Sequence, residues 1–149
     1  MSITYEIFNS MSFEKKNSIF QGRKMKKIYI IEDEKDISNL YKLLFEREGM
    51  EVESIVTSGR AAIEEIERLK EKLSDIVFII DNRIPEKSGL EVAQRLIEIS
   101  PTLRNQIIIA TADDTISKDQ VEDLGIPYFL RKPFSLEELL STVDSIEND

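Results

Sequence analysis

Short apolar runs that end in polar or charged residues constrain the fold of this chain more than any other feature. They lie at residues 28–31, 76–80, 107–110 and 128–130, and amphipathic stretches with helical spacing separate them. Four or five apolar residues suit a buried strand, whereas the longer periodic stretches suit helices. This alternation predicts an α/β domain in which a parallel sheet is covered by helices on both faces.

A fifth strand and five helices complete the expected architecture. Residues 52–56 follow Glu51 and include Glu53, an alternation typical of a partly exposed edge strand. The third helix is the clearest, because Ser88 and Glu91 have capping-box spacing and Pro101 follows the helix. The other helices are expected over residues 37–45, 63–73, 115–124 and from Ser135 onward. The fourth, over residues 115–124, has few apolar residues and is expected to be the least firmly held.

Composition excludes several classes of protein. The 149 residues include no cysteine and no histidine, so the usual zinc and copper ligands are absent and any bound metal is expected to be a hard cation held by oxygen. A net charge of −9 disfavours direct binding of nucleic acid. The sequence has no apolar run long enough to insert into a membrane and no signal-peptide pattern, so a cytoplasmic location is expected.

Residues 1–25 differ from the rest of the chain. They mix Ser, Asn, Phe and Lys without a sustained period, and they carry four basic and two acidic residues, so the acidic excess lies in residues 26–149. We expect residues 1–25 to form a flexible N-terminal extension and residues 26–149 to form the compact domain. The scattered apolar residues of the extension also permit an added strand or a dimer contact.

Three carboxylates are expected at one edge of the sheet. Glu32 and Asp33 follow the first strand and Asp81 follows the third, and ligands bind beyond the carboxyl ends of strands in open α/β sheets. Like charges this close raise each other's pKa unless a cation neutralises them. Mg²⁺ commonly takes one or two carboxylates and a phosphate oxygen, which makes it the expected cofactor.

Two further residues suit phosphoryl chemistry. Thr111 follows the fourth expected strand, and Lys132 follows the fifth. The Lys132 ammonium and the Thr111 hydroxyl could hold phosphoryl oxygens while Asp81 attacks the phosphorus. Taken alone, each residue also has an ordinary structural use, as a helix cap, a turn residue or a solvated charge.

With these residues in this order, the chain resembles the receiver domain of two-component response regulators. The resemblance covers about residues 26–147. It rests on Glu32-Asp33, on Asp81 with Pro85 and Gly89, on Thr111-Ala112, and on Lys132-Pro133-Phe134. It implies a flavodoxin-like, doubly wound sheet in the order 2-1-3-4-5. It also implies that Asp81 accepts a phosphoryl group from a histidine kinase or a histidine phosphotransfer protein.

The resemblance also implies roles for individual residues. Asp33, Asp81 and the backbone carbonyl of Arg83 would bind Mg²⁺ directly, and Glu32 would act through water. Thr111 and Lys132 would hold the phosphoryl group, and Thr111 would also act in the switch. Phe129, three residues before Lys132, falls on the family's switch aromatic, although a core aromatic fits equally well.

One position suggests a property of this particular chain. Arg83 lies two positions after Asp81 and is bulkier than the residue that many receiver domains have there. Asp113, two positions after Thr111, is its natural partner across the site. We predict that they pair and partly screen a phosphoaspartate from attacking water.

The function expected from the sequence is that of a stand-alone, non-enzymatic receiver that catalyses only its own phosphorylation and dephosphorylation. Its output is expected to be an altered partner contact or a homodimer through the fourth helix, the fifth strand and the fifth helix. Two alternatives remain. One is a phosphate-independent interaction module with the same fold, and the other is a metal-dependent phosphotransferase or phosphatase.

Overall fold

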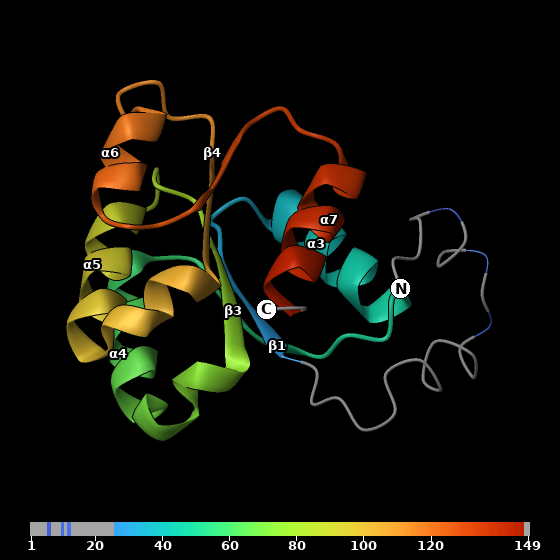
Figure 1. Ribbon diagram of the computed structural model, residues 1–149, viewed down its shortest axis with the longest axis horizontal. Helices are drawn as coiled ribbons and strands as arrows, with labels where there is room; N and C mark the ends of the chain where they lie inside the picture. The colour runs from blue at the N-terminus through green and yellow to red at the C-terminus, as the bar shows by residue number, and fades with distance from the viewer. Residues whose placement is uncertain (1–5, 7–9, 11, 13–25, 148–149) are drawn as a thin grey trace.

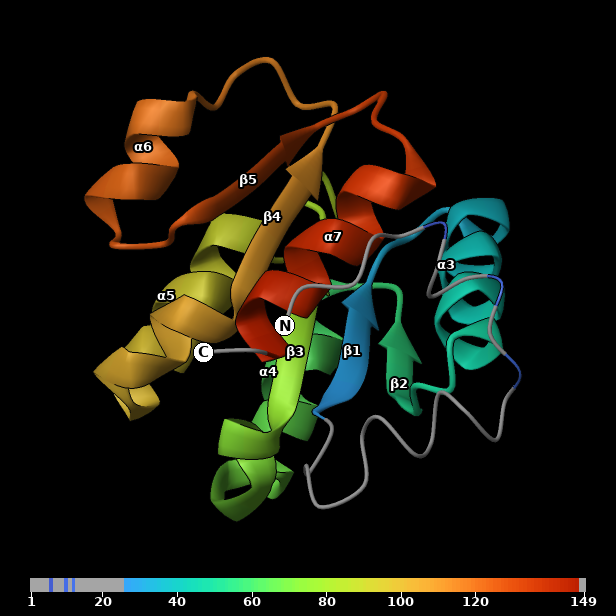
Figure 2. The same ribbon diagram turned by 45° about the vertical axis from the view of Figure 1, so that its right-hand side comes forward.

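The computed structural model describes residues 6, 10, 12 and 26–147, and residues 26–147 form a single α/β domain. Its five strands are all parallel and lie in the order β2-β1-β3-β4-β5, as predicted. Figure 1 shows β1, β3 and β4 between the two groups of helices, and Figure 2 shows all five strands. Within residues 26–147 the elements run β1 Lys27–Ile31, α3 Lys35–Arg47, β2 Val52–Val56, α4 Gly59–Arg68, β3 Ile76–Ile80, α5 Gly89–Ile99, β4 Ile107–Thr111, α6 Lys118–Asp123, β5 Tyr128–Arg131 and α7 Leu136–Glu147, with 3₁₀ turns at Lys70–Asp75 and Pro101–Gln106.

The sheet separates two apolar cores. Helices α3 and α7 cover one face, where Phe45 and Leu139 pack, while α4, α5 and α6 cover the other, where Ile66 and Leu96 pack (Figure 2). Every residue of β3 and β4 is buried, which explains why their sequences are continuous apolar runs rather than alternating ones. Burial on both faces holds the central strands in place. The loops at their carboxyl ends carry the residues of the predicted site.

Serine side chains cap the starts of α5, α6 and α7, the helices that follow β3, β4 and β5. The predicted capping box is present, because the Ser88 hydroxyl accepts from the Glu91 N–H and the Glu91 carboxylate accepts from the Ser88 N–H. A second box, which was not predicted, joins Ser117 and Gln120 at the start of α6. At α7 the Ser135 hydroxyl accepts a hydrogen bond from the Glu138 N–H.

Two helix boundaries differ from the sequence-based expectation. The fourth expected helix was placed over residues 115–124, but α6 spans only Lys118–Asp123 because Ser117 caps it and the preceding residues belong to a loop. The second was extended to Leu73, but α4 ends at Arg68 and Leu73 lies buried in the following 3₁₀ turn. In both cases a buried apolar residue lies just outside the helix, Ile116 before α6 and Leu73 after α4.

Close backbone approaches hold the loop after β3. A Cβ atom on Gly89 would lie 2.3 Å from the carbonyl oxygen of Asp81, and one on Gly59 would lie 2.1 Å from that of Lys87. Glycine is therefore required at both positions. The Gly59 N–H donates to the Pro85 carbonyl at 3.0 Å, so the start of α4 braces the loop that carries Asp81.

The expected extension over residues 1–25 lies outside the described residues, apart from Glu6, Ser10 and Ser12. Within the described part of the chain, no helix is both long enough and apolar enough to cross a membrane.

Candidate functional site

The predicted site residues converge at one edge of the sheet. β1 and β3 pair in register up to Ile31 and Ile80, and the Asp81 N–H donates to the Ile31 carbonyl at 3.0 Å. This pairing places Asp81 beside Glu32. On the other side, the Lys132 N–H donates to the Thr111 carbonyl at 2.9 Å, which places β5 against the end of β4. Parallel pairing thus brings four strand ends together.

The three predicted carboxylates form one cluster. Glu32, Asp33 and Asp81 each have a carboxylate oxygen within 4.8 Å of the others. Glu32 and Asp81 are buried, whereas Asp33 is exposed. Burial raises the pKa of Glu32 to about 7, its hydrogen bond with Lys132 opposes the rise, and the nearby Asp81 carboxylate adds to it. The three carboxylates at this edge of the sheet therefore carry more negative charge than the nearby Lys132 neutralises.

Lys132 is the counter-charge within the cluster. Its ammonium donates to Glu32 Oε1 and, at 3.0 Å, to Asp81 Oδ2. Burial favours the neutral amine, but the hydrogen bonds to Glu32 and Asp81 outweigh burial and raise the pKa of Lys132 to about 12. Lys132 therefore remains a cation beside Asp81 across the physiological pH range.

The second oxygen of Asp81 is also held. Asp81 Oδ1 accepts from the Thr111 hydroxyl at 2.6 Å and from the Arg83 N–H at 3.1 Å. Asp81 is thus oriented by donors from the loop after β3, from the end of β4 and from the loop after β5. Its carboxylate is fixed in position, with a hydroxyl on one oxygen and an ammonium on the other.

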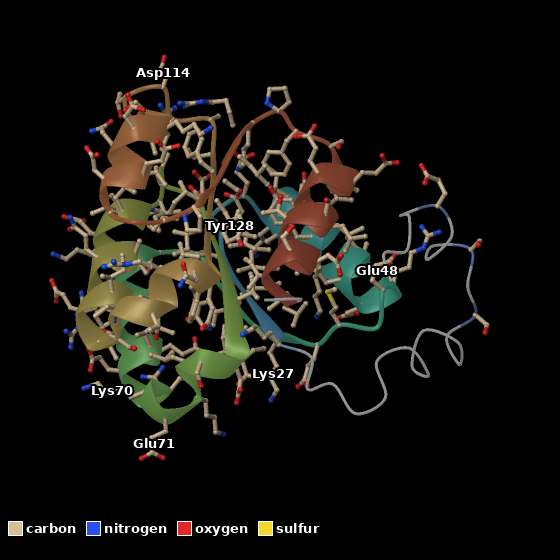
Figure 3. All side chains as sticks on the ribbon, in the orientation of Figure 1. Lys27, Glu48, Lys70, Glu71, Asp114 and Tyr128 are labelled. Carbon is tan, nitrogen blue, oxygen red and sulfur yellow. The ribbon has the colours of Figure 1, made fainter. Side chains whose placement is uncertain are left out.

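The predicted contact between Arg83 and Asp113 is present. Arg83 Nη2 lies 3.3 Å from Asp113 Oδ1, and the same oxygen accepts from the Thr115 hydroxyl at 2.6 Å and from the Thr115 N–H at 3.0 Å. Hydrogen bonds from Thr115, then those from Asn82 and Arg83, hold the pKa of Asp113 well below its usual range. The next residue, Asp114, projects from the tip of this loop into solvent (Figure 3).

Asn82 is a site residue that the sequence analysis missed. Its amide donates to Asp113 Oδ2 at 2.9 Å, and its carbonyl oxygen accepts from the Leu90 N–H at 2.9 Å. Asn82 therefore joins the loop after β3 to the start of α5 and to the loop after β4. The sequence contains one signal for this role: Asn82 directly follows a buried strand and Asp81, and a buried polar side chain at such a position needs hydrogen-bond partners.

Arg131 was also missed as a structural residue. Its guanidinium donates to the Asp113 carbonyl at 2.6 Å and to the Ile116 carbonyl at 2.8 Å, and it lies 4.9 Å from the centroid of the Phe129 ring. Alternation along β5 could have revealed the contact with Phe129, because residues two apart share one face of a strand. The carbonyl partners could not be read from the sequence.

The sequence profile of the response regulator receiver domain matches residues 28–144, which form the sheet and helices described above. The chain belongs to the response regulator receiver family. Receiver domains are phosphoacceptor signalling modules that interact with histidine kinases or phosphotransfer proteins and bind Mg²⁺ at an acidic pocket. The family assignment agrees with the resemblance inferred from the motifs.

Relatives and solved structures agree with this assignment. The phosphate regulon transcriptional regulatory protein PhoB of Rhizobium meliloti is 37% identical over 122 residues, which is 80% of this chain and 51% of PhoB. The transcriptional regulatory protein TrcR of Mycobacterium tuberculosis is 32% identical, over 77% of this chain and 42% of TrcR. The chain spans about half the length of the curated relatives it matches. Its expected action as a stand-alone receiver therefore stays a prediction.

Among solved structures, a response regulator receiver domain protein from Clostridium thermocellum superimposes with a TM-score of 0.70 at 28% identity, covering 83% of this chain and 95% of that one. The signal receiver domain of a Luxo repressor protein from Vibrio parahaemolyticus gives a TM-score of 0.68 at 26% identity, covering 83% and 91%. Both similarities extend over nearly the whole of the compared receiver domains.

The residues at the acidic edge suit Mg²⁺. Three carboxylates offer oxygen ligands, one of them exposed and two buried, and their mutual repulsion is only partly offset by one ammonium. A small divalent cation with a preference for oxygen would relieve that repulsion. The donor set therefore fits the cation that the family binds.

Proposed function

We propose that the chain accepts a phosphoryl group on Asp81 from the phosphohistidine of a histidine kinase or a histidine phosphotransfer protein, and signals by altered binding to a partner. The observation that carries this proposal is the placement of Asp81, whose two oxygens are held by the Thr111 hydroxyl and the Lys132 ammonium. A buried carboxylate between a hydroxyl and a cation, at the carboxyl edge of a parallel sheet, is suited to attack phosphorus.

In the proposed transfer, a carboxylate oxygen of Asp81 forms a bond to phosphorus while the bond between phosphorus and the donor's imidazole nitrogen breaks. The imidazole leaves with the electron pair, and the product is an acyl phosphate on Asp81. Lys132 and Thr111 then release the carboxylate and hold the oxygens of the phosphoryl group, whose negative charge the ammonium neutralises. Water later attacks the acyl phosphate, which restores the Asp81 carboxylate and releases inorganic phosphate. The phosphorylated histidine belongs to the donor protein, so the transfer needs no histidine in this chain.

Asp33, Asp81 and the Arg83 carbonyl would hold Mg²⁺, with Glu32 acting through water. The cation, when bound, neutralises the charge that accumulates on the phosphoryl oxygens. Glu32 is well placed for an indirect role, since its carboxylate already accepts from Lys132 and from the Glu34 N–H.

The proposed output surface comprises α6, β5 and α7. Helix α6 is six residues long and buries only Val121 of its own residues, and β5 forms an edge of the sheet with Phe129 half-buried. An element with so few buried anchors changes position at low cost. We propose that Thr111 and Phe129 change position on phosphorylation and that a partner protein or a second copy of the chain binds this surface. Residues 26–149 would act as the receiver unit, and residues 1–25 as an extension of it.

The decisive test is the intact mass of the protein after rapid acid quench, following incubation with acetyl phosphate. We expect one phosphoryl adduct on the wild type with Mg²⁺, and none on Asp81→Asn or after chelation of Mg²⁺. Asp144→Asn, which changes an exposed aspartate on α7, should still form the adduct. Absence of an adduct, also with phosphorylated candidate kinases, would instead support the phosphate-independent interaction module.

A further inference from the structure

Arg131 joins the end of β5 to the loop between β4 and α6. From the end of β5, its guanidinium reaches the Asp113 carbonyl and the Ile116 carbonyl in the loop between β4 and α6, and it also lies over the ring of Phe129. The two hydrogen bonds are charge-assisted and go to carbonyls three residues apart. The planar guanidinium suits this geometry, because its nitrogens can donate in two directions while its face rests on a ring.

The same loop also contacts Thr111. The Asp113 N–H donates to the Thr111 hydroxyl oxygen at 3.1 Å, and that hydroxyl donates to Asp81. Asp113 thus contacts Arg131 through its carbonyl and Thr111 through its N–H. A chain of hydrogen bonds therefore runs from Arg131 through Asp113 and Thr111 to Asp81.

One buried apolar residue anchors this loop, and one anchors the helix that follows it. Ile116 is its buried apolar residue, and the following helix α6 buries Val121 alone. The Asp113 side chain is held by Asn82, Arg83 and Thr115, of which only the first two come from outside the loop. Arg131 supplies two polar contacts between β5 and this loop.

We propose that Arg131 is a positioning residue for Thr111. It holds the loop of residues 112–117 and the Phe129 ring together, so that the Thr111 hydroxyl stays on Asp81 until the aspartate is phosphorylated. The loop and the ring then change position as one unit. This inference rests on the proposed function for the change that phosphorylation causes, but the anchoring itself is a property of the unphosphorylated protein.

The test follows the Thr111 methyl group by ¹H–¹³C NMR, with assignment through Thr111→Ser. In wild type we expect one methyl position without phosphodonor and a second with acetyl phosphate and Mg²⁺. In unphosphorylated Arg131→Ala the methyl signal should move toward the phosphorylated position, with the fraction of that arrangement raised by about five- to tenfold, as expected for the loss of charge-assisted hydrogen bonds.

Two variants make the comparison specific. Arg60→Ala removes an exposed arginine of α4 that pairs with Glu64 and Glu86, and it should leave the Thr111 methyl signal unchanged. Arg131→Lys keeps a cation near Phe129 but has only one nitrogen for the two carbonyls, so its signal should lie between those of wild type and Arg131→Ala. Should Arg131→Ala fail to fold, Arg131→Gln carries the same test.

Coincidence of the Thr111 methyl signals in unphosphorylated wild type and Arg131→Ala would overturn the inference. So would an equal shift in Arg60→Ala. Absence of a phosphoryl adduct on the wild type would overturn only the proposed function, because the comparison of unphosphorylated proteins still shows whether Arg131 positions Thr111.

Discussion

The amide of Asn82 donates a hydrogen bond to the carboxylate of Asp113 across 2.9 Å, and both side chains are buried. This bond connects the loop that carries the proposed acceptor to the loop that follows Thr111. It also places the carboxylate of Asp113 where Arg83 can pair with it. Together with the contact between Arg83 and Asp113, this bond fixes two loops that are about 30 residues apart in sequence relative to each other.

Asn82→Ala should lower the free energy of unfolding by about 1–3 kcal/mol, because it leaves Asp113 Oδ2 and the Leu90 N–H without this partner. Urea unfolding followed by circular dichroism measures the change. Asn105→Ala, at an exposed asparagine, is the matched control and should change stability by less than about 0.5 kcal/mol. Equal midpoints for the two variants would show that the buried bond contributes no net stability.

Arg83→Ala should shorten the lifetime of the phosphorylated form. The Arg83 side chain is bonded to Asp113 beside the acceptor, and its removal opens the acyl phosphate to water. We expect the dephosphorylation rate to rise by about three- to tenfold, which corresponds to roughly 1 kcal/mol of barrier. The rate is followed by intact mass after removal of the phosphodonor, with Arg60→Ala as control. An unchanged rate in Arg83→Ala would show that the pair does not screen the phosphoaspartate.

Stability should depend on pH through Glu32. Its pKa is raised from 4.5 to about 7, so between these values the folded protein retains a proton that the unfolded chain has released. The contribution is fully present below about pH 4.5 and is lost as pH rises through 7. Without Mg²⁺, this group should lower the free energy of unfolding by about 1–2 kcal/mol over that interval, after allowance for partial screening by solvent.

Urea midpoints from pH 4.5 to pH 8 measure this dependence. Glu32→Gln should flatten it, whereas Glu137→Gln, at an exposed glutamate of α7, should follow the wild type. Parallel curves for wild type and Glu32→Gln would mean that the pKa of Glu32 is the same in the folded and unfolded states.

Mg²⁺ should stabilise the folded domain through Asp33. A ligand that binds only the folded state adds about 1.4 kcal/mol at a tenfold excess over its Kd. Thermal unfolding with and without Mg²⁺ should show this gain in wild type and in Asp36→Asn, which changes an exposed first-turn residue of α3, and a much smaller gain in Asp33→Asn. An equal gain in all three proteins would place the cation elsewhere.

The sequence by itself determined the layers of the fold and the set of reactive residues. Buried strands need continuous apolar runs, which is why the strands could be located in the sequence. Parallel strands bring their carboxyl ends to one edge of the sheet, so the sequence positions alone predicted the convergence of Glu32, Asp33, Asp81, Thr111 and Lys132. The spacing after Asp81 and Thr111 also predicted the contact between Arg83 and Asp113. The strand order came from the family resemblance, because apolar runs do not state which strands are neighbours.

Only the tertiary structure decided how the loops are held. The start of α6 depends on which residues the preceding loop uses, and the partners of Asn82 and Arg131 are backbone and carboxylate groups on other strands' loops. Local spacing carries no information about such partners. The hydrogen-bond partners of these side chains depend on which strands are neighbours, because strand pairing brings the loops at the sheet edge within reach of one another.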